Sequence, residues 1–250
     1  MKLAFLSLLV LTSLAAIAQK NPKGNPAAPA QPKTDTSAII AHYERMYAAA
    51  LDFNDLQTAT VAMYQILAYR PSDAGIKDTL ARLYFTRGMS LQALLAGEEV
   101  LESQADNQAI LEVVAVCQDN LGLAKEALET YEKLFALTKS HYHQYQVASL
   151  QYRLKRLGEC QANLMALAQA NGLEEQKITM NYGQAGSQHV NLKAAVINML
   201  GVLELDMGKT DTAKQLFEQA IKLDPEFLLA LSNLESLNNP KTDKGGASGK

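Results

Sequence analysis

The chain has 250 residues, of which 48% are apolar, 20% charged and 6% aromatic, and it has no Trp. This apolar fraction is enough to build a substantial core, which excludes an intrinsically disordered chain and a collagen. Asp and Glu outnumber Lys and Arg by 26 to 23, and this balance argues against a nucleic-acid-binding protein, which needs a surplus of cations to neutralise phosphates.

Residues 1–18 have the pattern of a cleaved export signal. Lys2 is followed by a mostly apolar run from Leu3, and Ala16 and Ala18 form a small-x-small cleavage pattern before Gln19. An uncleaved anchor helix is the alternative, but the run is shorter than the roughly 20 apolar residues that cross a bilayer. We therefore expect an exported protein, periplasmic or secreted, with no membrane span after cleavage.

The composition changes sharply at both ends of the remaining chain. Residues 19–35 hold four of the seven prolines among Asn, Gly, Ala and Gln, which predicts an extended, disordered linker. Residues 240–250 are rich in Gly and Lys and predict a disordered tail. The folded domain is therefore expected to span residues 36–239.

Within this domain a small set of residue types recurs at a fixed spacing. A Gly or Asn able to end a helix in the left-handed conformation is followed five residues later by a small or polar residue. Apolar positions four and three residues further on complete the buried stripe of a second helix. This pattern predicts antiparallel helix pairs. The helix-ending residues and their small or polar partners are Asn54 and Ala59, Gly88 and Ala93, Gly122 and Ala127, Gly158 and Asn163, and Gly208 and Ala213.

The units begin at residues 40, 74, 108, 144 and 194, at intervals of 34, 34, 36 and 50. This period and pattern resemble the tetratricopeptide repeat (TPR) family. The residues in the family's places in the last unit are Leu200, Gly201, Gly208, Ala213, Phe217, Ala220 and Pro225. Three departures, Glu204, Gly97 and Asn163, predict looser packing in their units.

The resemblance implies an all-α fold, a right-handed α-solenoid of helix-turn-helix repeats with a capping helix at residues 225–238. Leu228, Leu231 and Leu234 would form the apolar stripe of that cap, which stacked repeats need in order to cover the last apolar face. A generic helical bundle is the alternative. The expected repeats are residues 40–73, 74–107, 108–143, 144–177 and 194–227.

An insertion at residues 174–192 interrupts the repeats. Ile178, Met180 and Tyr182 alternate with polar residues, and Val190 and Leu192 do so again after a turn at residues 183–187. This alternation predicts a β-hairpin with one apolar face. Two interpretations remain open, a flap that packs on the neighbouring helices and an edge that binds an extended peptide by strand addition.

No catalytic motif is recognisable, so we expect no enzyme activity and no cofactor. His141 and His143 lack a third metal ligand nearby in the sequence, which favours a solvated helix start over a metal site. Cys117 and Cys160 lie in neighbouring units. The sequence alone leaves open whether they form a disulfide bond.

In the family, the first helices line a concave groove through positions 2, 5, 9, 12 and 13 of each unit. The resemblance implies a groove lined by Glu44, Arg82, Phe85, Glu112, Asp119, Asn120, Tyr145, Tyr152, Lys155, Arg156 and Asn198.

Tyr145, Tyr152, Lys155 and Arg156 are predicted to form the centre of this surface, because binding centres favour aromatic residues and Arg. An ordinary solvated helix face is the alternative. The family's carboxylate-clamping set is absent, since the corresponding places hold Glu44, Asp78, Glu112 and Ala148.

The sequence thus predicts a non-catalytic interaction scaffold of the cell envelope, with a protein or peptide in its groove. An accessory or regulatory component of an envelope enzyme or glycan-uptake assembly is the alternative. An enzyme is disfavoured because no set of acid, base and nucleophile emerges.

Overall fold

The computed structural model describes residues 36–181 and 186–239. The expected signal, linker and tail, together with Tyr182 and most of the expected hairpin turn, lie outside these ranges. The described elements are α1 (Ser37–Asp52), α2 (Leu56–Tyr69), α3 (Ala74–Thr86), α4 (Ser90–Ser103), α5 (Gln108–Asn120), α6 (Ala124–Thr138), α7 (His141–Arg153), α8 (Leu157–Gln169), β1 (Lys177–Asn181), β2 (Ser187–Asn191), α9 (Leu192–Asp206), α10 (Thr210–Leu223) and α11 (Leu228–Asn238).

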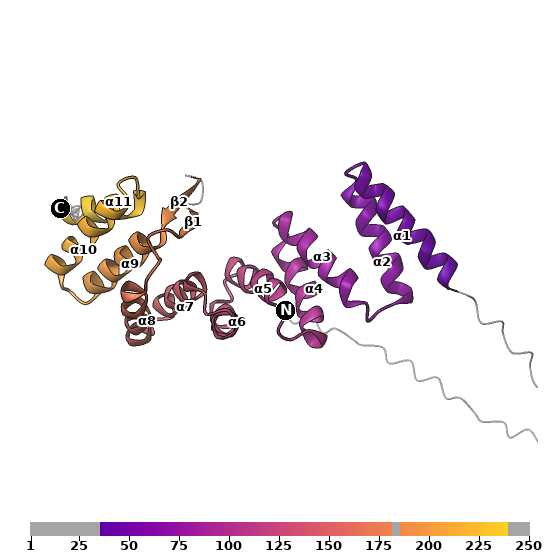
Figure 1. The fold of residues 1–250 in the computed structure, drawn as a ribbon, viewed down its shortest axis with the longest axis horizontal. Helices are drawn as coiled ribbons and strands as arrows, with labels where there is room; N and C mark the ends of the chain where they lie inside the picture. Colours follow the sequence, from indigo (N-terminus) through magenta and orange to yellow (C-terminus); the bar gives the residue numbers. More distant parts are fainter. Residues whose placement is uncertain (1–35, 182–185, 240–250) are drawn as a thin grey trace, which may run out of the picture.

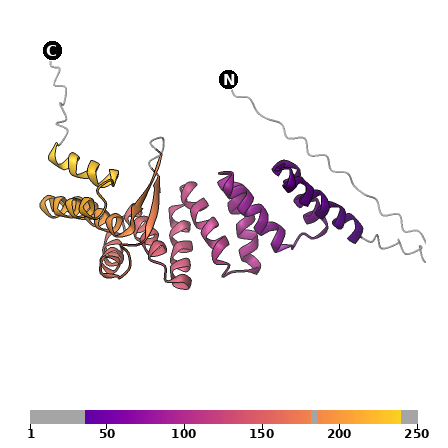
Figure 2. The same ribbon diagram turned by 45° about the horizontal axis from the view of Figure 1, so that its top comes forward.

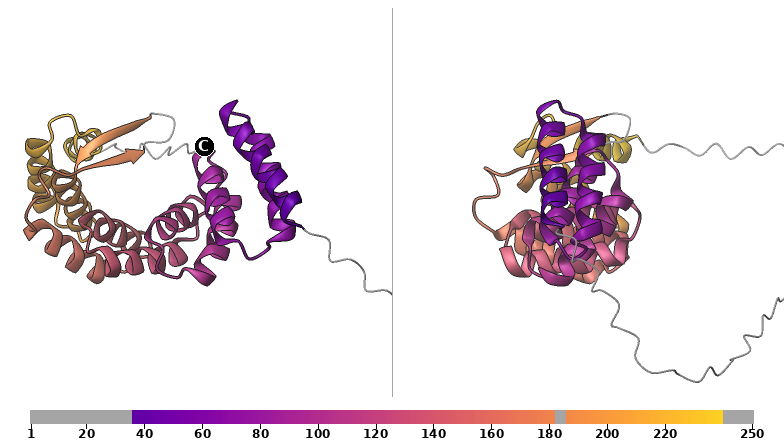
Figure 3. Two further views of the ribbon diagram at one scale, coloured as in Figure 1. Left: turned by 45° about the vertical axis from the view of Figure 1, so that its right-hand side comes forward. Right: turned by 90° about the vertical axis from the view of Figure 1, so that its right-hand side faces the viewer.

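Consecutive helices pack as pairs, and each pair packs on the next, so the helices follow one another along the molecule in chain order (Figures 1 and 2). The stack curves into an arc, and the hairpin projects across its open side (Figure 3, left). The predicted α-solenoid with a hairpin insertion and a terminal helix is confirmed.

The helix boundaries follow from capping residues at both ends. The side chains of Asp73 and Asn107 accept hydrogen bonds from backbone N–H groups at the starts of α3 and α5, which satisfies donors that a helix leaves unpaired. Asn54, Gly88 and Gly122 have φ values of 54°, 69° and 78°. These residues turn the chain between paired helices, as their spacing predicts.

The fourth unit differs from the prediction by three residues. Gly158 lies inside α8, and the residue with a left-handed conformation is Lys155, whose φ is 60°. Consequently α7 begins at His141, three residues before the expected start, and Cys160 takes the place of the small buried residue. The prediction was wrong because it assumed that a glycine ends the first helix of this unit. Lys155 takes that role instead, and adopts the left-handed conformation at a modest cost in strain.

Gly97 does not loosen its repeat. A Cβ atom at this position would lie 2.7 Å from Cγ2 of Val114, so the absence of a side chain lets α4 and α5 approach each other. Asn163, the second departure, donates hydrogen bonds to Gln151 and to the backbone of Glu159. Both departures therefore take part in the packing instead of weakening it.

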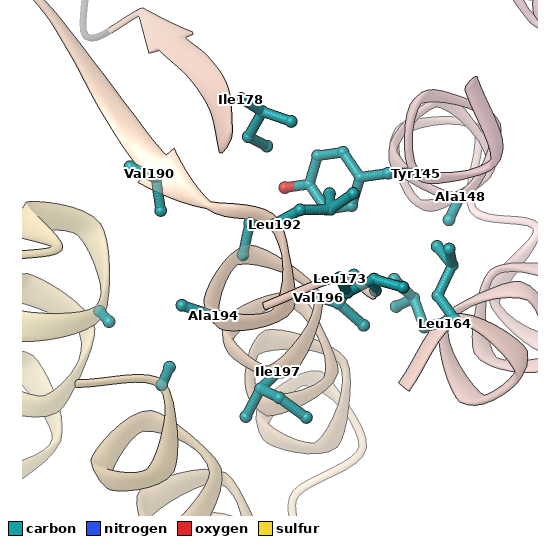
Figure 4. Packing of buried hydrophobic residues seen from close by; sticks show 14 of the residues in the cluster. Tyr145, Ala148, Leu164, Leu173, Ile178, Val190, Leu192, Ala194, Val196 and Ile197 are labelled. Carbon is teal, nitrogen blue, oxygen red and sulfur yellow. The ribbon is translucent and has the colours of Figure 1, made fainter. Parts of the chain in front are cut away.

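The two strands pair antiparallel, with Ile178 opposite Val190 and Met180 opposite Gln188. Ile178 and Val190 are buried in the same apolar cluster as Tyr145 of α7 and Leu192 of α9 (Figure 4). The strand ends one residue earlier than predicted, because Leu192 begins α9. The hairpin therefore packs on the neighbouring helices, as a flap would.

The terminal helix α11 caps the stack with a different face from the one predicted. Leu228 and Leu231 are 54% and 39% exposed, whereas Phe227 and Ala230 are fully buried. The apolar stripe is therefore shifted along the helix, because Phe227, just before α11, points into the stack. None of the helices within residues 36–181 and 186–239 is long and apolar enough to cross a membrane.

Candidate functional site

Two cavities lie on the surface formed by the first helices of successive repeats. The first cavity, of about 520 Å³, lies among α3, α5 and α7. It is lined by Arg82, Phe85, Thr86, Ala109, Glu112, Val113, Val116 and Tyr142.

The second cavity, of about 390 Å³, lies where α7, β1, α9 and α11 meet. It is lined by Tyr145, Ser149, Tyr152, Met180, Asn198, Met199, Val202, Leu229 and Asn233. Its position brings together a repeat, the insertion, the last repeat and the capping helix.

The first cavity has charged groups of both signs. The Arg82 guanidinium donates hydrogen bonds to Asp78 one helical turn earlier, with Nε 2.5 Å and Nη2 3.3 Å from its carboxylate oxygens. Asp78 also accepts a hydrogen bond from the side-chain amide of Asn107. Arg82 is thus partly neutralised, and the exposed Glu112 carboxylate adds negative charge to the cavity wall.

Tyr152 is held firmly at the edge of the second cavity. Its hydroxyl donates a 2.7 Å hydrogen bond to Oδ2 of Asp206, and the Lys155 ammonium lies 5.3 Å from the centre of its ring. Burial, together with the hydrogen bond to Asp206, raises the pKa of Tyr152 to about 12. The phenol therefore remains neutral at physiological pH.

Six of the predicted groove residues line the two cavities, three in each. Arg82, Phe85 and Glu112 line the first cavity, and Tyr145, Tyr152 and Asn198 line the second.

Asp119, Asn120 and Glu44 lie outside both cavities. Asp119 accepts a hydrogen bond from Arg153, Asn120 donates to Ser90, and Glu44 pairs with Arg70.

The predicted cluster around Tyr145 and Tyr152 is only partly formed. Lys155 lies over Tyr152, but Arg156 precedes α8, pairs with Glu159 and lines a separate cavity with Lys125 and Leu154. The three-residue displacement of the fourth unit explains this result. Positions 12 and 13 of that unit are Tyr152 and Arg153, so Arg156 falls in the turn.

The sequence reasoning missed several lining residues. Tyr142 and Ser149 occupy positions 2 and 9 of a unit that begins at His141, and the small residue Cys160 is the signal that would have identified this start. Met180 and Leu229 come from the insertion and the capping helix. No repeat pattern predicts their place, because neither element belongs to a repeat.

His143 is buried and is not part of a solvated helix start. Its Nδ1 lies 2.8 Å from Oγ1 of Thr138, and its burial lowers its pKa. His141 Nδ1 lies 3.2 Å from the side-chain amide of Gln176. Among the described residues, no three His, Cys, Asp or Glu side chains are grouped so that they could hold a metal ion.

Cys117 and Cys160 are both free and fully buried. They belong to different apolar clusters, which lie in different parts of the stack. Burial raises the pKa of both thiols, that of Cys160 to about 11. The open question of a disulfide is thus answered in favour of two buried thiols.

Residues 194–227 match the family model of the tetratricopeptide repeat. The uncharacterized protein ycf37 of Pyropia yezoensis is 33% identical over 66 residues, which cover 26% of this chain. The match covers 37% of that relative, so the chain spans little more than a third of its length.

Solved structures of repeat proteins superpose on most of the stack. YrrB, described as a TPR protein with an unusual peptide-binding site, has a TM-score of 0.61 at 16% identity, covering 80% of this chain and 98% of its own. A tetratricopeptide repeat protein from Parabacteroides merdae has a TM-score of 0.60 at 16% identity, covering 80% and 73%. The MamA protein has a TM-score of 0.52 at 20% identity, covering 67% and 82%.

These similarities and the stacked helix pairs define an α-solenoid, a fold in which stacked repeats create an extended concave surface. Residues 194–227 are thus similar to a tetratricopeptide repeat, and the stack as a whole has the fold of the tetratricopeptide repeat proteins on which it superposes. Proteins with this fold typically serve as non-catalytic scaffolds for protein interactions.

Proposed function

We propose that this protein is a non-catalytic scaffold that holds a protein or peptide partner against its concave face. The observation that carries the proposal is the arrangement of the two cavities, which share one wall. Tyr142 lines the first cavity and Tyr145 the second, and these residues are one turn apart on α7. A single extended ligand can therefore contact both cavities.

The chemistry of the lining residues supports binding rather than catalysis. The hydroxyl of Ser149 has no histidine beside it in the lining of the second cavity, and Tyr152 is engaged with Asp206. In the first cavity the Arg82 guanidinium donates a hydrogen bond to the Asp78 carboxylate. Binding surfaces use such fixed polar groups to orient a ligand between apolar walls.

The proposed location is the cell envelope, reached by export. The basic start, apolar run and small-x-small site within residues 1–18 support this location. Residues 1–18 fused to a phosphatase that is active only after export should yield activity outside the cytoplasm. A fusion with Leu8→Arg and Leu11→Arg, which breaks the apolar run, should remain inactive. Equal activity of both fusions would contradict export by this segment.

The binding proposal is tested with a phage library of random dodecapeptides panned on immobilised residues 19–250. A double variant, Phe85→Ser with Tyr152→Ala, removes one wall from each cavity, and Met165→Ala is the control on exposed α8 surface. We expect peptides enriched on the wild type to bind the control equally and the double variant at least tenfold more weakly. Equal binding to the double variant would remove the concave face as the site.

A further inference from the structure

The second cavity differs from the first in its chemistry. None of its nine lining residues carries a charge, whereas Arg82 and Glu112 line the first cavity. Its walls are made by the rings of Tyr145 and Tyr152 and by apolar side chains such as Val202. A charged group placed there would lose its hydration without gaining an ionic partner.

Three polar side chains of this cavity are fixed by hydrogen bonds within the chain. The Asn233 amide donates a 3.0 Å hydrogen bond to Oδ1 of Asn198, which is buried, and Tyr152 donates to Asp206. Met180 and Met199 are flexible, polarisable side chains that adapt to the shape of a ligand. The cavity thus combines a preorganised polar frame with adaptable apolar walls.

The hairpin is held beside the second cavity by two kinds of contact, apolar packing and side-chain hydrogen bonds. Ile178 and Val190 are buried against the helices, and the Gln188 side chain bonds to the loop before α11. The Gln188 side-chain amide donates to the carbonyl of Glu226 in that loop, and its side-chain oxygen accepts from the N–H of Leu228, the first residue of α11. Since Met180 lies opposite Gln188 in the strand register, its place at the cavity is set by these contacts.

After removal of the proposed export signal, residues 1–18, the chain's own terminal segments offer no suitable ligand for this cavity. Residues 19–35 and 240–250 contain no Leu, Ile, Val, Met, Phe or Tyr. Their side chains larger than Pro are polar or charged, which the uncharged lining disfavours. Under the proposed function, a partner polypeptide is then the source of a side chain for this cavity.

We infer that the second cavity is the anchor site for one large, uncharged apolar side chain, such as Leu, Met or Phe, of a partner peptide. This inference rests on the proposed function and assigns the ligand chemistry and the role of the insertion within it. The hairpin supplies a wall of the site through Met180. Neighbouring residues of the peptide lie toward the first cavity, whose lining includes Tyr142, one turn from Tyr145 on α7. These neighbouring residues are polar, because Arg82 of α3 and Glu112 of α5 also line that cavity.

The test uses peptides enriched on residues 19–250, labelled with a fluorophore and titrated by fluorescence anisotropy. We expect the enriched peptides to share one large apolar residue, and its replacement by Ser to weaken binding at least tenfold. Ser149→Phe fills the cavity and Met180→Glu places a charge in its wall, so each variant should cause a similar loss. Met165→Glu, on exposed α8, is the matched control and should bind as the wild type does. Circular dichroism checks that all variants are folded.

The outcomes separate this inference from the proposal on which it rests. Peptides that bind Ser149→Phe and Met180→Glu normally but are lost with Phe85→Ser would overturn the anchor site and leave the concave scaffold standing. Binding unaffected by any concave variant would overturn both. Phe53 is 85% exposed at the far end of the stack. Self-association that Ser149→Phe and Phe53→Ser both abolish would assign the cavity to a second copy and overturn the partner peptide.

Discussion

Gly201 of α9 and Phe217 of α10 are packed so closely that a Cβ atom on Gly201 would lie 2.6 Å from Cε1 of Phe217. Phe217 is fully buried and has little room to move aside. This contact fixes the distance between the two helices of the last repeat. Gly97 and Val114 play the same part between α4 and α5.

Replacing Gly201 by Ala is expected to lower the free energy of unfolding by about 1–3 kcal/mol, because overpacking outweighs the gain of about 0.5–1 kcal/mol in helix propensity. Gly158→Ala is the matched control, since Gly158 lies inside α8 and a Cβ atom there would have no neighbouring atom within 4 Å. Because Gly158 is the second residue of α8, that variant should lose no stability and gain at most about 0.5–1 kcal/mol. Urea unfolding followed by circular dichroism measures both. A gain in both variants would contradict the close packing at Gly201.

How far the fold is predictable from sequence is clear from Gly122 and Lys155. Where Gly122 supplies the left-handed residue, the helix boundaries follow from the spacing. Where Lys155 adopts the same conformation, the sequence pattern assigns the helix-ending role to Gly158 instead. The predicted unit is therefore displaced by three residues. Backbone conformation there is decided by the burial of Cys160 and Leu164, which is a tertiary effect.

The candidate site was predictable only where the repeat pattern extends. Arg82, Phe85 and Glu112 line the first cavity as expected, because their positions follow from the period. The second cavity also needs Met180 and Leu229. Their placement depends on how the hairpin and α11 dock, which local patterns do not encode.

A second prediction concerns the N-cap of α3. The Asp73 carboxylate accepts hydrogen bonds from the N–H groups of Gly75 and Ile76, each 3.1 Å away. Asp73→Ala should lower the free energy of unfolding by about 1 kcal/mol. Thr36→Ala is the control, because the N-cap Thr36 makes no side-chain capping bond. Equal urea midpoints for Asp73→Ala and the wild type would show that the cap contributes nothing.

A third prediction concerns the thiols. Cys117 and Cys160 are fully buried, and their raised pKa keeps both protonated at pH 8. Because the thiolate is the reactive form, the native protein should react with Ellman's reagent at least tenfold more slowly than a free thiol. In guanidinium chloride both thiols should react, with no need for a reductant. Absence of reaction in denaturant would instead reveal a disulfide bond.

The last prediction uses the buried imidazole of His143, whose pKa is lowered from 6.5 by burial. The unfolded state therefore binds a proton on this ring at a higher pH than the native state does. Its contribution to stability is complete above pH 6.5 and decreases as the pH falls below that value, because protons then favour unfolding. Urea unfolding at pH 7.5 and 5.5 should show a smaller loss of stability on acidification in His143→Gln than in the wild type. An equal loss in both proteins would mean that other groups carry the pH dependence.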